Sequence, residues 1–255
     1  MDRPLILVSN DDGINAPGIR ALIDVVREIG DVVVVAPDGP QSGMGHAITL
    51  NSTLRCDQIH IDDGPQIEYE CSGTPVDCVK LAVSTILERK PDLCVSGINH
   101  GSNSSINVIY SGTMSAAVEG ALEGVPSIGF SLLDYSHDAD FSASKQVVKT
   151  IVEKVLKEGL PKGRCLNVNI PKLDYSDIKG FKICRQADAN WVEDFDERKD
   201  PTGRTYYWLT GSFQNFDKGN DTDEWALANG YVSIVPVQYD ITAYDCISDL
   251  KLWNL

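Results

Sequence analysis

The chain has 255 residues and a composition typical of a globular domain, with a formal net charge of −15. Such an acidic surface repels nucleic-acid backbones and argues against binding to a duplex. No apolar run approaches the ~20 residues of a membrane span and the N-terminus lacks the layout of a signal peptide, so we expect a cytoplasmic protein without membrane contact.

The first predicted unit is a strand, an acidic turn and a helix. Residues 5–8 form an apolar run typical of a buried strand, and residues 17–29 show helical spacing of apolar positions after a proline. Between them, Asp11 and Asp12 follow the strand directly. In an open α/β sheet ligands bind beyond the carboxyl ends of the strands, and two adjacent carboxylates repel each other unless a cation joins them. The alternative is a solvated turn of common turn-forming residues.

A second buried strand is predicted over residues 31–36. The loop after it is rich in glycine and should lie beside the acidic turn, where Ser42 offers a neutral oxygen. His46, in the same loop, is more typical of a surface polar residue than of a ligand. Short strands are expected over residues 47–54 and 67–72.

The middle of the chain continues the alternation. Thr74 and Pro75 predict the start of a helix that runs to about residue 87. A strand over 92–96 leads into a loop rich in Gly, Asn and Ser, and Ser111, Gly112 and Thr113 precede a helix of small residues. Such a helix N-terminus suits a phosphate group, although the same hydroxyls also serve as ordinary N-caps. The remaining predicted elements are a strand over 126–131, a helix around 147–156 and a strand over 165–170.

Beyond about residue 175 the alternation stops, and only strand-like pieces over 181–184, 205–209 and 231–236 and a short helix over 225–229 are predicted. We therefore divide the chain into an α/β core over residues 1–175 and a β-rich C-terminal extension over 176–255. Aromatic residues are favoured at subunit interfaces, and the extension contains Trp191, Tyr206, Tyr207, Trp208, Trp225 and Tyr231. This pattern predicts a homo-oligomer that assembles through the extension.

The seven cysteines are scattered along the sequence without any Cys-x-x-Cys spacing. This usage predicts free thiols in a reducing compartment and argues against a zinc site.

The three loops together would present two carboxylates, a hydroxyl, an amide oxygen and a glycine-lined helix N-terminus. Such hard oxygen ligands favour Mg²⁺ or Mn²⁺ over zinc or copper. A cation held there can polarise a phosphoryl oxygen and lower the pKa of a bound water. The predicted chemistry is metal-assisted hydrolysis of a phosphate monoester.

Four motifs occur in this order along the chain: Val-Ser-Asn-Asp-Asp-Gly-Ile-Asn-Ala-Pro-Gly (8–18), Gln-Ser-Gly (41–43), Ser-Gly-Ile-Asn-His-Gly-Ser-Asn (96–103) and Tyr-Ser-Gly-Thr (110–113). Together they resemble the SurE family of stationary-phase survival proteins. Further matching motifs, Gly-Thr-Pro (73–75), Gly-Arg-Thr-Tyr-Tyr-Trp (203–208) and Thr-Asp (222–223), extend the resemblance to nearly the whole chain.

The resemblance implies a Rossmann-like, mostly parallel sheet sandwiched by helices, and a metal-dependent nucleotidase that hydrolyses nucleoside monophosphates. It leaves 3′-nucleotidase and exopolyphosphatase activity open beside 5′-nucleotidase activity, and homodimer open against homotetramer. The implied ligands of one Mg²⁺ or Mn²⁺ ion are Asp11, Asp12, Ser42 and Asn99. The implied substrate-binding residues are Asn103, Ser111, Gly112 and Thr113. We expect water to attack the phosphorus, with Asp11 or Asp12 as the proton acceptor.

Three other protein classes fit the sequence less well. A receiver-type signalling domain needs an acceptor Asp at the end of its central strand, where this chain has Val95-Ser96-Gly97. A haloacid-dehalogenase-type phosphatase needs Asp-x-Asp with a nucleophilic first Asp, whereas this chain has Asp-Asp-Gly. A pure binding module would explain the glycines but not the cluster of oxygen ligands.

Overall fold

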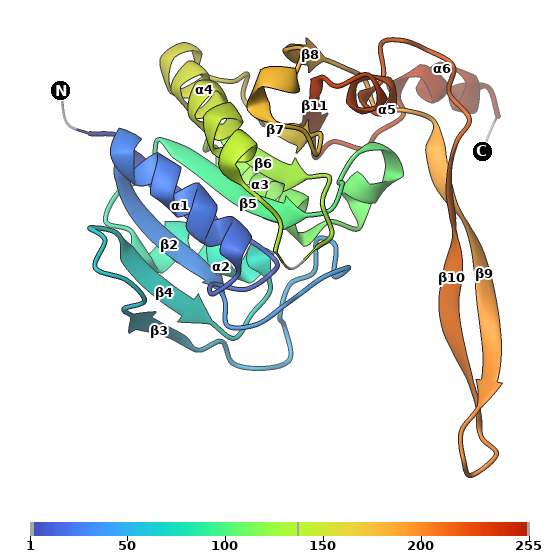
Figure 1. Cartoon of the computed structure of the whole chain (residues 1–255), viewed down its shortest axis with the longest axis horizontal. Helices are drawn as coiled ribbons and strands as arrows, with labels where there is room; N and C mark the ends of the chain where they lie inside the picture. Colours follow the sequence, from blue (N-terminus) through green and yellow to red (C-terminus); the bar gives the residue numbers. More distant parts are fainter. Residues whose placement is uncertain (1–2, 137, 254–255) are drawn as a thin grey trace.

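The computed structural model describes residues 3–136 and 138–253. Its centre is one nine-stranded sheet in the order β3-β4-β2-β1-β5-β6-β7-β11-β8, with helices on both faces (Figure 1). The six strands from β4 to β7 run parallel, while β3 and β11 join the two ends antiparallel. The strands of this sheet are β1 (Leu5–Ser9), β2 (Asp31–Pro37), β3 (Cys56–Ile59), β4 (Ile67–Cys71), β5 (Leu93–His100), β6 (Ser127–Leu132), β7 (Arg164–Ile170), β8 (Phe181–Ile183) and β11 (Val232–Gln238). This architecture confirms the predicted α/β fold.

Helices cover the sheet because successive residues of a buried strand point to opposite faces. In β1, Ile6 and Val8 join the core cluster beneath α1 and α4, while Leu7 joins the cluster beneath α2 and α3. The helices are α1 (Pro17–Ile29), α2 (Pro75–Leu81), which continues as a π-helical turn over Ala82–Ile86, α3 (Gly112–Leu122), α4 (Ser142–Glu158), α5 (Asp223–Ala228) and α6 (Ile247–Leu250). No helix in the described ranges is both long and apolar enough to cross a membrane.

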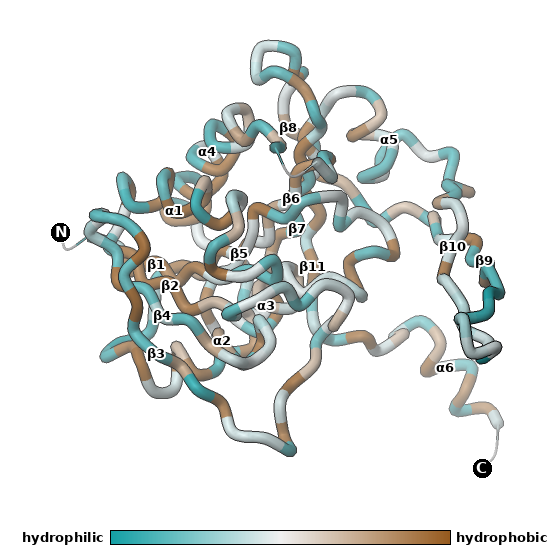
Figure 2. The backbone as a smooth tube through the Cα atoms, turned by 60° about the horizontal axis from the view of Figure 1, so that its bottom comes forward, coloured by the Kyte–Doolittle hydropathy of each residue, from teal (hydrophilic) through white to brown (hydrophobic). Residues whose placement is uncertain are grey.

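The chain beyond residue 175 does two things. It adds β8 and β11 to the main sheet, and it forms a separate antiparallel pair of β9 (Ala189–Lys199) and β10 (Thr205–Asn215), which we call the arm. The arm extends away from the sheet (Figure 1). The central strands β1 and β2 are mostly hydrophobic, whereas hydrophobic and hydrophilic stretches are mixed along the arm (Figure 2).

Three of the predicted strands differ from the structure by more than two residues. The strand predicted over 92–96 is β5, which continues four residues further to His100, so Asn99 lies in the strand and not in the loop after it. Residues 47–54 contain no strand, and β4 pairs instead with β3, which begins at Cys56. The long strand β9 was not predicted, because its charged residues break any apolar run, and β10 continues six residues beyond the predicted end at residue 209.

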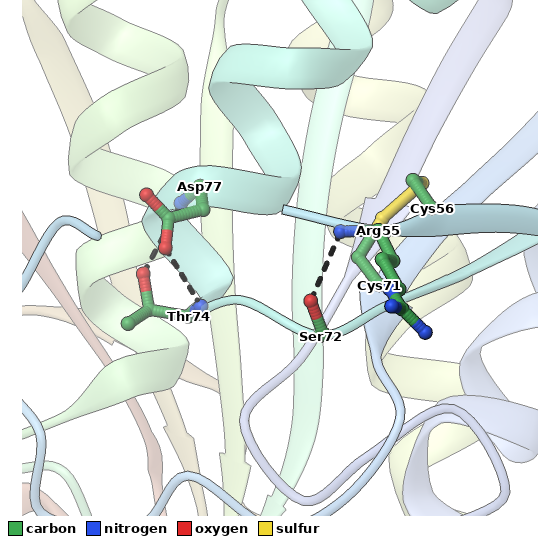
Figure 3. The surroundings of a disulfide bond; sticks show 6 residues. All are labelled: Arg55, Cys56, Cys71, Ser72, Thr74 and Asp77. Carbon is green, nitrogen blue, oxygen red and sulfur yellow. Dashed lines mark hydrogen bonds between the residues drawn. A yellow bond between two sulfur atoms is a disulfide. The ribbon is translucent and has the colours of Figure 1, made fainter. Parts of the chain in front are cut away.

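The expectation that all cysteines are free thiols is wrong for one pair. Cys56 and Cys71 lie directly opposite each other in the β3–β4 pairing and form a disulfide (Figure 3). The cause is the register of the hairpin, which the spacing of cysteines along the sequence does not reveal. Next to the disulfide, Thr74 and Asp77 form the capping box of α2, as the predicted N-cap requires (Figure 3). The remaining cysteines are free: Cys78, Cys94, Cys165, Cys184 and Cys246.

Candidate functional site

The acidic turn lies where β1 ends. Asn10 closes the turn by donating from Nδ2 to the carbonyl oxygen of Gly13, at 2.9 Å. Gly13 has φ +94°, and a Cβ there would lie 3.2 Å from the backbone of Gly39 in the next loop. A residue without a side chain is therefore required where the first two loops meet. Asp11 is 4% exposed and Asp12 is half-buried.

Asp11 is fixed by the helix that follows the third loop. The Thr113 hydroxyl donates to its carboxylate, and a Cβ on Gly112 would lie 2.5 Å from the Cβ of Asp11, so only glycine allows this approach. Burial raises the pKa of Asp11 to about 6; the bond from Thr113 opposes this shift, and the charge of Asp12 adds to it. The ionised form of Asp11 is therefore less favoured than in an exposed aspartate, and a positive charge nearby would stabilise it.

Asp12 has only partial compensation inside the protein. Burial raises its pKa, and the charge and backbone N–H of His100 oppose the shift only in part. Its Oδ2 atom is buried and has no hydrogen-bond partner in the part of the chain that the structure describes. An unpartnered carboxylate oxygen beside a second carboxylate fits a bound cation.

The other two candidate metal ligands, Ser42 in the loop after β2 and Asn99 near the end of β5, lie beside this acid pair. Ser42 and Asn99 line one cavity of about 250 Å³ together with Asp11 and Asp12, and no Lys or Arg is among the described residues of its wall. Asn99 donates from Nδ2 to the carbonyl oxygens of His100 and Gly101, which leaves its amide oxygen as the ligand atom. No group of three or more His, Cys, Asp and Glu suited to a metal occurs within residues 3–136 and 138–253. A cation here would therefore depend on two carboxylates plus neutral oxygens, which suits a hard ion such as Mg²⁺ or Mn²⁺.

The four candidate substrate-binding residues divide into two pairs. Asn103 and Ser111 line the cavity. Ser111 is also the N-cap of α3, because its Oγ accepts from the backbone N–H of Met114 at 3.0 Å. Gly112 and Thr113 contact Asp11 instead, and Thr113 is fully buried. In this structure the Thr113 hydroxyl thus orients a carboxylate at the site.

His46 is not part of the cavity wall. Its Nε2 lies 2.8 Å from Oε2 of Glu119 on α3, and Lys80 pairs with the other carboxylate oxygen. Burial by itself would raise the pKa of Glu119, but these two partners lower it below its usual value. The contact holds the loop that carries Ser42 against α3.

Several cavity residues were not predicted to belong to the site, and one of them, Trp191, was expected at a subunit interface. His100, Tyr110, Tyr135 and Trp191 also line the cavity. Trp191 is the third residue of β9 in the arm and donates from Nε1 to Oδ1 of Asn107 at 2.8 Å. Periodicity does not identify them, because they come from loops, from the last position of β5 and from the arm. Asn167 and Asn169 alternate with apolar residues in β7, and both are hydrogen-bonded to the backbone of Asn103. Two asparagines in a mostly apolar strand could therefore have indicated a polar contact near the site.

Comparison with known proteins places the chain in a family. It matches the family described as "Survival protein SurE" over residues 6–193. It is 66% identical over 254 residues to the "5'-nucleotidase SurE" of Christiangramia forsetii, covering 99% of this chain and 98% of the relative. It is also 66% identical to the protein of the same name from Flavobacterium psychrophilum, over 100% and 99% of the two chains. The crystal structure of the SurE protein from Aquifex aeolicus superposes with a TM-score of 0.84 at 42% identity, covering 98% of this chain and 99% of the other. The chain therefore belongs to the SurE family.

Proposed function

We propose that the chain is a metal-dependent 5′-nucleotidase that hydrolyses nucleoside monophosphates to nucleoside and phosphate. The observation that carries this proposal is the buried acid pair with an unpartnered oxygen on Asp12, in a cavity shared with Ser42 and Asn99. The names of the relatives at 66% identity support the substrate class.

In this proposal Asp11, Asp12, Ser42 and Asn99 hold one divalent cation, Mg²⁺ or Mn²⁺. When bound, the cation polarises the phosphoryl group and lowers the pKa of a water. Asn103 and Ser111, with the N-terminal end of α3, orient the phosphate oxygens. Asp11 or Asp12 accepts the proton of the attacking water, and Thr113 keeps Asp11 in place.

We further propose that the chain is a homodimer or homotetramer held by the C-terminal part, residues 176–255. The arm supports this, because Phe195, Tyr207, Trp208 and Leu209 are each 58% exposed or more. An isolated two-stranded hairpin is marginally stable in water, so a partner that covers these side chains would stabilise it.

The decisive experiment measures hydrolysis of nucleoside 5′-monophosphates by the metal-free protein before and after addition of Mg²⁺ or Mn²⁺. We expect turnover only with metal, and its loss in excess chelator. Full activity in excess chelator would contradict the metal site, and no hydrolysis of any nucleoside 5′-monophosphate with metal present would contradict the nucleotidase. Parallel assays with nucleoside 3′-monophosphates and polyphosphate determine whether those activities accompany it.

A further inference from the structure

The loop over residues 102–105, which carries Asn103, is held in an unfavourable conformation. Ser105 is buried and has φ +53°, the single positive φ of a non-glycine residue in the described ranges. Such a conformation persists only where surrounding contacts enforce it. The Ser105 hydroxyl lies 2.9 Å from the carbonyl oxygen of Ala187 and 2.7 Å from that of Ala189, and its one proton is shared between these two acceptors. Both carbonyls belong to the root of the arm, residues 185–189.

The second part of the restraint is Asp223, which is 1% exposed and lies in the first turn of α5. Its Oδ2 accepts from the backbone N–H of Ser105 at 2.8 Å. Its Oδ1 accepts from the backbone N–H groups of Ala187, at 2.9 Å, and Glu224, at 2.8 Å. One buried carboxylate therefore binds the root of the arm with one oxygen and the loop of Asn103 with the other. Burial raises the pKa of Asp223, and these three N–H donors oppose that shift.

Asn103 lies in this loop and is also bonded to the sheet. The backbone N–H of Asn103 donates to Oδ1 of Asn169 and its Nδ2 donates to Oγ of Ser131, both at 2.8 Å. These bonds fix Asn103 from the side of the sheet, whereas Ser105, two residues later, fixes the loop from the side of the arm. A displacement of Ser105 would shift Asn103 relative to the acid pair.

We propose that Asp223 and Ser105 are positioning residues, which clasp the root of the arm to the loop of Asn103 and thereby set the affinity for the substrate. This role rests on the proposed function, in which Asn103 binds the phosphate. It extends that function, because it makes substrate affinity depend on where the arm lies.

Asp223→Asn tests the clasp with a side chain of the same shape but with one acceptor oxygen fewer. Asparagine has one acceptor oxygen, which is best placed at the Oδ1 position, where two N–H donors converge. The amide NH₂ then faces the N–H of Ser105, so the loop loses its acceptor while the root of the arm keeps its own. We expect KM for a nucleoside 5′-monophosphate, and Ki for inorganic phosphate, to rise about tenfold, the scale of one lost buried hydrogen bond. kcat and Mn²⁺ affinity should change far less, because Asp11, Asp12 and Ser42 lie on other loops and Asn99 lies in β5, outside the loop over residues 102–105.

Two further variants complete the test. Asp177→Asn makes the same charge change at an exposed residue of the same C-terminal part and should leave KM unchanged. Ser105→Gly tolerates the positive φ but removes the hydroxyl that bonds to the root of the arm, and it should also raise KM. If Asp223→Asn does not fold, Ser105→Gly takes its place in the test. Amide hydrogen exchange should also be faster around residues 103–105 in Asp223→Asn.

The outcomes separate the clasp from the proposed function. A folded Asp223→Asn protein, or in its place Ser105→Gly, with wild-type KM and wild-type exchange would overturn the clasp, as would a fall in stability with no change in KM or Ki. A wild-type chain that hydrolyses no nucleoside monophosphate would overturn the nucleotidase. In that case faster exchange around residues 103–105, with weaker phosphate binding, would still support the clasp.

Discussion

The site and the arm both depart from the usual arrangement, in which charged groups are exposed and large apolar side chains are buried. At the site, carboxylates are inside: Asp11 is 4% exposed and beside Asp12. On the arm, large apolar side chains are outside: Trp208 is 58% exposed and Leu209 is 63% exposed. Buried charge and exposed apolar surface are both costly unless a partner compensates them. This difference agrees with the two proposals made above, in which a cation with its substrate compensates the buried carboxylates and another subunit covers the arm.

The largest effect is expected at the acid pair. Asp12→Asn keeps the shape of the side chain but removes one of the two charges that would hold the cation. kcat/KM should fall by about 10³-fold or more, because the cation supplies several kcal/mol of transition-state stabilisation. Mn²⁺ affinity, measured by calorimetry, should fall as well, whereas the stability of the metal-free protein should stay level or rise, since like-charge repulsion is relieved.

The matched control is Asp38→Asn, an exposed aspartate in the neighbouring loop, which should behave as wild type. Wild-type activity of Asp12→Asn at ordinary metal concentrations would show that the buried charge needs no cation.

The next largest loss of activity is expected at Thr113, which holds the Asp11 carboxylate. Thr113→Val keeps the side-chain volume but removes the hydroxyl that donates to the Asp11 carboxylate. We expect kcat/KM to fall by about 10²-fold, the scale of losing one preorganised donor at a catalytic site. Thr113→Ser retains the hydroxyl and should recover most of the activity. Steady-state kinetics measure kcat/KM of the two variants. Equal activity of Thr113→Val and Thr113→Ser would show that the hydroxyl is not needed for catalysis.

The arm is tested by placing a charge on its apolar surface. Trp208→Glu should weaken subunit association by about 30-fold or more, because an aromatic anchor at an interface contributes about 2 kcal/mol or more. Light scattering over a dilution series measures this, and Gln146→Glu on the exposed side of α4 supplies the same charge change as a control. A wild-type protein that is already monomeric at micromolar concentration would contradict assembly through the arm.

The smallest effect on activity is expected at the disulfide, which distinguishes the β3–β4 hairpin from the uncrosslinked arm. Cys56 and Cys71 are 15 residues apart, so the crosslink restricts the unfolded chain. Cys56→Ser should lower the free energy of unfolding by up to about 3 kcal/mol, with kcat/KM little changed. Denaturant unfolding should show the same loss in the wild type after reduction, whereas Cys246→Ser, at an exposed free cysteine, should cause none. A wild type whose stability is indifferent to reductant would exclude the crosslink.

Much of the site could be predicted from the sequence because parallel strands share a direction. Apolar runs at residues 5–8, 31–36 and 92–96 predict buried strands, and the loops after parallel strands meet at one edge of the sheet. This rule brings the segments after these strands together, and the resemblance to the SurE family selects Asp11, Asp12, Ser42 and Asn99 within them; the structure has all four in the wall of one cavity. The same rule says nothing about their roles, which remain proposals.

What only the tertiary structure decided are contacts between segments far apart in the chain. Thr113 donates to Asp11 across 102 residues, and Asp223 accepts from Ser105 across 118 residues. The pairing of Cys56 with Cys71 and the entry of Trp191 into the cavity wall are of the same kind. Periodicity reports which face of an element is buried, since that depends on local backbone geometry. Which side chains then meet depends on the register of paired strands and on how close two backbones approach, as Gly112 allows at Asp11, and no local pattern contains that information.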